Sequence, residues 1–171
     1  QEKFVFVPYV PNGRFVEALD TVGDVWLDAT CIFAHQEFSG CKMGGITSVE
    51  GDKWPVKNCQ IVSGHIHRSH SPQKNIYYSG SAIQVAFGES DRNIIPCLTF
   101  SGKKMSIREV DLKLPRKKIV HLDVNDVDEY EHPVESKNEI KVSISGNYEQ
   151  FKALKKTTKY KQLIDKGVKI V

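Results

Sequence analysis

The chain has 171 residues, a hydrophobic fraction of 40% and a formal net charge of +3. This length allows one full domain, or a medium domain with a small one. No apolar run approaches the roughly 20 residues of a membrane-spanning helix, which excludes that class of protein.

The first fifteen residues have neither the basic start nor the long apolar core of a secretory signal peptide. We therefore expect a non-secreted, cytoplasmic protein with reduced cysteines. The four cysteines are Cys31, Cys41, Cys59 and Cys97.

The predicted elements begin with a buried strand at 3–10, a short helix at 12–22 and a second buried strand at 29–35. Residues 36–58 are rich in glycine and predict a loop. Two further strands and a hairpin about a Ser-Gly-Lys turn follow, at 59–67, 75–81 and 94–112.

The rest of the chain predicts a strand at 117–124, a polar loop at 125–138 and a strand–helix–strand unit. That unit has a strand at 139–146, one or two helices at 147–167 and the start of a strand at 168–171. The pattern predicts an α/β protein with a first domain at 1–112, a linker at 113–138 and a small module at 139–171.

Charge is distributed unevenly between these parts. Residues 137–171 contain nine lysines and three acidic residues, a net charge of +6, whereas the other 136 residues carry a net charge of −3. A basic surface suits phosphate backbones, although a solvated lysine-rich helix face is an equally simple interpretation.

Two histidines stand at the carboxyl end of the strand at 59–67 in the stretch "VSGHIH", and a third ends the strand at 29–35. Side chains two residues apart on an extended segment point to the same side, so His65 and His67 are expected to share one direction. Gly64 would let the backbone bend there. Together with His35, these imidazoles would suit a transition metal at strand ends.

Simpler interpretations remain for these residues. A His-x-His pair is common on protein surfaces. A structural zinc site with Cys31, His35, Cys41 and the histidine pair is conceivable, although C-x3-H-x5-C matches no standard closed site. His70 has no assigned role. His121 and His132 lie outside the cluster and are expected to be structural or exposed.

The segments "IFAHQEF", "VSGHIHRS" and "IYYSGSAIQVAFGE" resemble, in this order and spacing, the second half of calcineurin-like metallophosphoesterases. The resemblance is to the SbcD-type DNA repair and recombination nucleases, which include phage-encoded versions. It implies the second half of a β-sandwich flanked by helices over residues 1–112. The remainder resembles, more loosely, the small α/β capping domain of those nucleases.

The resemblance also implies chemistry and partners. His35 and His65 would bind one divalent ion and His67 a second, most commonly Mn²⁺, with Mg²⁺, Fe²⁺ or Zn²⁺ as alternatives. The complete protein would be an exonuclease or endonuclease that acts on DNA, forms a homodimer and works with an SbcC-type, SMC-like ATPase. A phosphoprotein or nucleotide phosphatase, or a non-catalytic DNA-binding scaffold, are the alternatives.

The first half of that family supplies an Asp-x-His motif, a Gly-Asp motif and an Asn-His-Asp motif with the catalytic histidine. The sequence has no Asp-x-His or Asn-His, and its Gly-Asp pairs at 23–24 and 51–52 fall too late in the chain. We therefore expect this chain alone to be inactive and to bind one metal ion weakly at most.

Five lysines are candidates for contact with DNA. Lys42 lies in the glycine-rich loop, whose backbone could approach a phosphate closely. On one helix that begins near Tyr148, positions spaced i, i+3, i+4 and i+7 form one face. These positions hold Lys152, Lys155, Lys156 and Lys159.

Overall fold

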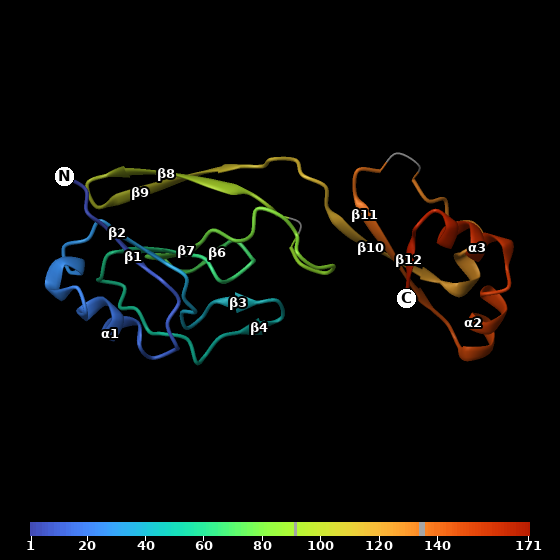
Figure 1. The fold of residues 1–171 in the computed structure, drawn as a ribbon, viewed down its shortest axis with the longest axis horizontal. Helices are drawn as coiled ribbons and strands as arrows, with labels where there is room; N and C mark the ends of the chain where they lie inside the picture. Colours follow the sequence, from blue (N-terminus) through green and yellow to red (C-terminus); the bar gives the residue numbers. More distant parts are fainter. Residues whose placement is uncertain (91, 134–135) are drawn as a thin grey trace. The chain divides into compact units, whose positions relative to one another are not determined.

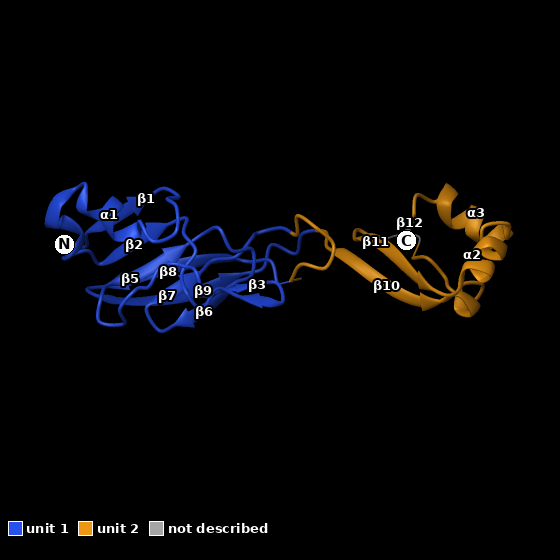
Figure 2. Ribbon diagram, turned by 90° about the horizontal axis from the view of Figure 1, so that it is seen from below, with its two compact units in different colours: residues 1–83, 92–114 blue, residues 84–91, 115–171 orange. Residues whose placement is uncertain are grey.

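The structure is a computed structural model that describes residues 1–90, 92–133 and 136–171 (Figure 1). The chain forms two compact units (Figure 2). The first contains residues 1–83 and 92–114, and the second contains residues 84–91 and 115–171. Within the described residues, no helix has both the length and the apolar character needed to cross a membrane.

The first unit is built on a five-stranded sheet with the order β1-β2-β5-β7-β6. Its first four strands are parallel, and β6 pairs antiparallel with β7. In sheet order the strands are β1 (Phe4–Val7), β2 (Cys31–Ala34), β5 (Gln60–Ser63), β7 (Ile76–Tyr78) and β6 (His70–Gln73). The apolar runs of β2, β5 and β7 suit strands buried on both faces.

Each face of this sheet has its own cover. On one face, Ile32 and Ile61 pack in a core with Phe15 and Leu19 of helix α1 (Phe15–Asp20). On the other, a cluster around Val62 packs against the hairpin of β8 (Ile95–Ser101) and β9 (Lys104–Val110). The unit also contains a short 3-10 helix η1 (Gly23–Trp26) and a small hairpin of β3 (Lys42–Met43) and β4 (Ile46–Thr47).

The second unit is a three-stranded parallel sheet with the order β10-β11-β12. Its strands are β10 (Lys117–Asp123), β11 (Glu139–Ser145) and β12 (Lys169–Ile170), and a 3-10 helix η2 (Val124–Asp126) follows β10. Helices α2 (Tyr148–Leu154) and α3 (Thr158–Asp165) lie on the same side of this sheet (Figures 1 and 2).

The mixed α/β class agrees with the sequence prediction, whereas the specific metallophosphoesterase sandwich stays a prediction. The structure differs at the proposed linker, 113–138. Strand β10 lies inside that range and pairs with β11 over seven residues, and its Leu122 packs against the core of the second unit. Part of the range, residues 134–135, lies outside the described residues.

Candidate metal centre

The histidines follow neighbouring strands that end at the same edge of the sheet. Ala34 of β2 and Ser63 of β5 are register partners, and the Gly64 N–H donates to the Ala34 carbonyl at 2.9 Å. His35 and His65 leave the sheet directly beyond this pair. The carboxyl ends of parallel strands are the usual place for ligands in α/β sheets.

His35 and His65 lie together. Their ring centroids are 5.3 Å apart and their planes meet at 78°, and both residues are exposed. Tyr9, from the segment after β1, stacks on the His65 ring at 5.4 Å. Three strand ends therefore contribute to the surroundings of this histidine pair.

Gly64 has a different role from the one expected. The backbone turns at His65, which has a φ of +74°, whereas Gly64 is absent from the described residues with positive φ. A Cβ added at Gly64 would lie 2.8 Å from Nδ1 of His35. The His35 ring therefore occupies the space where a side chain at Gly64 would begin.

Because the backbone turns at His65, the alternation of an extended strand no longer indicates that His67 points to the same side as His65. Strand β5 ends at Ser63, so the alternation of an extended strand does not continue through the two histidines. His67 is exposed, and its carbonyl accepts a hydrogen bond from the Ser81 N–H at 2.9 Å.

His70 has a structural role. Its Nε2 accepts from the Lys42 N–H at 2.9 Å, so Nδ1 carries the proton and donates to the Arg68 carbonyl at 2.9 Å. The ring stacks on Tyr78 with centroids 5.1 Å apart. Because both nitrogens are engaged, His70 is not a ligand candidate.

His121 and His132 belong to the second unit. They therefore lie apart from the histidine pair, as the sequence predicts. His121 is exposed on β10, and Nδ1 of His132 lies 3.3 Å from the Tyr130 hydroxyl.

A buried hydrogen-bond network holds the chain just after His35. Gln36 is fully buried; its N–H donates to the Ser63 hydroxyl at 2.9 Å, and its Nε2 donates to Asp52 at 2.7 Å. The Tyr78 hydroxyl donates to the Gln36 carbonyl at 3.0 Å, and burial raises the pKa of Tyr78. The network fixes the direction in which β2 ends.

Asp52, in the late Gly-Asp pair, belongs to this network. Its carboxylate accepts from the backbone N–H groups of Gly13 at 3.1 Å and Phe15 at 3.3 Å, in addition to Gln36. Asp52 therefore ties the start of α1 to the segment after β2. The sequence offered no local signal for this role, because its partners lie 16 to 39 residues away.

Glu37 also has a structural position. It accepts hydrogen bonds from Asn12, at 3.4 Å, and from the Ser48 hydroxyl. These contacts connect two loops near the sheet edge.

The alternative zinc site with Cys31, His35 and Cys41 is wrong. Cys31 and Cys41 are fully buried in different core clusters, on opposite faces of the sheet. Burial raises the pKa of Cys31 to about 12, which keeps this thiol protonated. All four cysteines are free.

The donor set at the sheet edge fits part of a transition-metal site. Imidazole nitrogens suit Fe²⁺ and Zn²⁺, whereas Mn²⁺ favours oxygen ligands, and the close approach of His35 and His65 brings two imidazoles together. Across residues 1–90, 92–133 and 136–171, no three His, Cys, Asp or Glu side chains are grouped so that they could hold a metal ion. The pair needs further ligands to form a complete centre.

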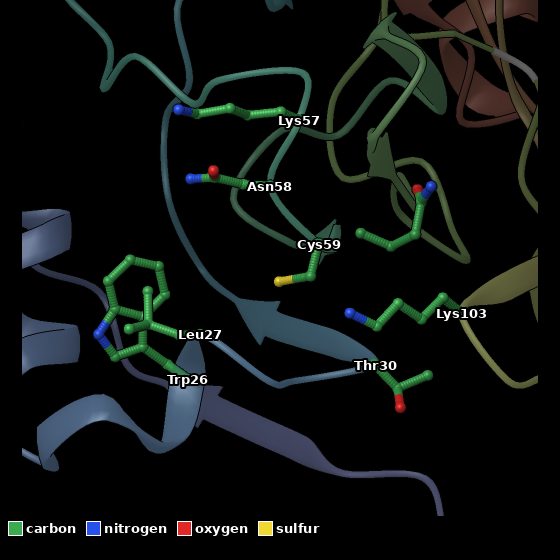
Figure 3. A pocket seen from close by; sticks show the side chains of 8 residues that line it. Trp26, Leu27, Thr30, Lys57, Asn58, Cys59 and Lys103 are labelled. Atoms are coloured by element: carbon green, nitrogen blue, oxygen red, sulfur yellow. The ribbon is translucent and has the colours of Figure 1, made fainter.

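A cavity of about 210 Å³ lies at the opposite edge of the sheet (Figure 3). Thr30 precedes β2 and Cys59 precedes β5, so the cavity opens at the amino ends of these strands. Trp26, Leu27 and Lys103 also line it. None of the histidines lines it.

The structure does not form the expected helical face of Lys152, Lys155, Lys156 and Lys159. Helix α2 ends at Leu154 and α3 begins at Thr158, with Thr157 capping α3 through a hydrogen bond from the Tyr160 N–H. Lys155 and Lys156 lie in the break, so the i, i+3, i+4, i+7 spacing does not apply. Lys42 is exposed on β3.

Two viral proteins resemble this chain closely. "Putative phosphoesterase 078R" of Invertebrate iridescent virus 3 is 47% identical over 169 residues, which cover 96% of this chain and 49% of that protein. "Putative phosphoesterase 244L" of Invertebrate iridescent virus 6 is 43% identical over 159 residues, which cover 90% of this chain and 56% of that protein. The two relatives support a phosphoesterase family. The chain spans about half the length of these curated relatives. No protein-family model matches it.

Proposed function

We propose that the chain is part of a metal-dependent phosphodiester hydrolase, a DNA exonuclease or endonuclease that acts in repair or recombination. The observation that carries this proposal is the pairing of His35 and His65, 5.3 Å apart, at the ends of adjacent parallel strands. The names of the two viral relatives support the hydrolysis of phosphoesters, and we propose DNA as the substrate in addition.

His35 and His65 would hold a divalent ion, most commonly Mn²⁺, and His67 would contribute to a second one. When bound, such ions polarise phosphoryl oxygens and lower the pKa of a water molecule. The chain's own part is to orient the imidazoles: the Gln36 network fixes the segment of His35, and Tyr9 stacks on His65. Carboxylate ligands would have to come from elsewhere in a complete protein.

DNA as substrate is supported by the net charge of +6 over residues 137–171. A homodimer and an SMC-like ATPase partner belong to the same proposal through the family resemblance. A phosphatase of the same superfamily would need no such basic region.

The test of this proposal uses a protein that has this chain's sequence and the full length of the viral relatives. With Mn²⁺, we expect it to degrade end-labelled duplex DNA and to lose this activity when His65 is replaced by glutamine. The matched control is His121→Gln, an exposed histidine of the second unit. Hydrolysis of p-nitrophenyl phosphate without any attack on DNA would instead identify a phosphatase.

A further inference from the structure

The sheet of the second unit has one face that the helices do not cover. Val142 and Ile144 of β11 are buried in a core with Leu154 and Leu163 of the two helices. Side chains alternate along a strand, so the intervening positions of β11 point to the other face. That open face carries Glu139, Lys141, Ser143 and Ser145 of β11.

Three lysines gather at one end of the open face. Lys117 of β10 is the register partner of Glu139, and Lys169 of β12 is the register partner of Lys141. All three surround the ring of Phe87, which belongs to the same unit. The distances from Nζ to the ring centroid are 5.4 Å for Lys117, 5.8 Å for Lys141 and 5.5 Å for Lys169.

The charges of this group do not balance. Glu139 forms ion pairs with both Lys117 and Lys169, and these lysines hold the pKa of its carboxyl down at about 2. Among the described residues, Lys141 makes no ion pair, so three positive charges face one negative charge. Like charges on directly opposite positions of neighbouring strands destabilise a sheet, so this arrangement favours an external anion.

We propose that this open sheet face, centred on Phe87, Lys141 and Lys169, binds single-stranded nucleic acid. A half-exposed aromatic ring offers a stacking platform for a base, and the neighbouring ammonium groups match backbone phosphates. The proposal deepens the proposed function and rests on it, because it names the form of polymer that the second unit holds. The proposed contact with nucleic acid lies on the open sheet face instead of on the lysines expected along a helix.

The test measures binding of a fluorescent fifteen-nucleotide oligothymidylate to the chain by anisotropy, over a series of salt concentrations and in EDTA. The double variant Lys141→Gln/Lys169→Gln should bind about tenfold more weakly. Its plot of log affinity against log salt should lose about 1.4 units of slope, at about 0.7 for each phosphate contact. The control, Lys152→Gln/Lys155→Gln, removes two charges from the helix side and should bind like the wild type.

Phe87→Leu is a second variant that keeps all three lysines. It should weaken binding about tenfold with an unchanged salt slope, because it removes stacking and leaves the charges in place. Far-UV circular dichroism checks that each variant is folded. An oligouridylate of the same length shows whether the face distinguishes RNA from DNA, and binding of either one supports the proposal.

Three outcomes would overturn the proposal: equal losses in the sheet and helix variants, tighter binding of duplex than of single strand, or full competition by polyglutamate at equal charge. The binding assay contains EDTA and therefore measures nucleic-acid binding without divalent ions. A negative result in this assay is thus separate from a failure of the proposed metal-dependent hydrolysis. The hydrolysis is measured independently, with Mn²⁺ and bis(p-nitrophenyl) phosphate on the full-length protein.

Discussion

At the scale of single residues, the histidine pair depends on a glycine that touches it. Gly64 lies where any Cβ would meet the His35 ring, and His65 adopts a left-handed backbone conformation that is uncommon outside glycine. Strained residues cluster at functional sites, and this one lies beside the candidate ligands.

Gly64→Ala should displace the His35 ring from His65, because the added Cβ would lie 2.8 Å from Nδ1. We expect a loss of about 1–3 kcal/mol in the free energy of unfolding, measured with urea, together with weaker binding of Mn²⁺. The matched control is Gly45→Ala, since Gly45 has no neighbour within 4 Å of an added Cβ. A neutral effect at Gly64 would show that the ring moves aside without cost.

Glu139 predicts a dependence of stability on pH. Its pKa is lowered from 4.5 to about 2 by hydrogen bonds from Lys117 and Lys169, so its contribution is fully present above about 4.5. That contribution should fade as the pH falls towards 2. The wild type should be more stable than Glu139→Gln at pH 6, and the two should converge near pH 2 in thermal unfolding. A constant difference across this range would contradict the assignment.

At the scale of elements, the strands were predictable and the connections between them were less so. Continuous apolar runs predicted β2, β5 and the β8–β9 hairpin. The side chains of these runs pack in the two core clusters on either face of the first unit's sheet. Strand β6 was not predicted, because it contains Pro72 and is polar. The sequence left one or two helices open at 147–167, but the place of the break was not predicted, because the lysine spacing suggested one continuous face across Thr157.

The candidate site was predictable only in part. The motif "VSGHIH" drew attention to His65, and the pairing with His35 follows from parallel strands that end together. The network of Gln36 and Asp52 was not visible, because its hydrogen bonds join segments far apart in the sequence.

Asp52→Ala should loosen the connection between α1 and the segment after β2. The change leaves two backbone N–H groups and the buried Gln36 amide without their acceptor. We expect the free energy of unfolding to fall by about 1–3 kcal/mol in urea titrations. The control is the exposed Glu50→Ala, two residues away, which should change stability by less than about 0.5 kcal/mol. Equal effects at both positions would contradict this role.

At the scale of the whole molecule, the chain combines a sheet that presents histidines with a second unit whose last part, residues 137–171, carries a net charge of +6. The short segment 84–91 belongs to the second unit although it follows the first unit's sheet in sequence. Gln84 there accepts from the Lys117 N–H at 2.7 Å. The chain spans about half the length of its two viral relatives.

The most direct test of the central claim is a titration of the chain with Mn²⁺, followed by electron paramagnetic resonance. We predict one weak site, at least tenfold weaker in His35→Gln and in His65→Gln, and unchanged in the control His121→Gln. Equal Mn²⁺ binding by all four proteins would contradict a metal site at the end of β2 and β5.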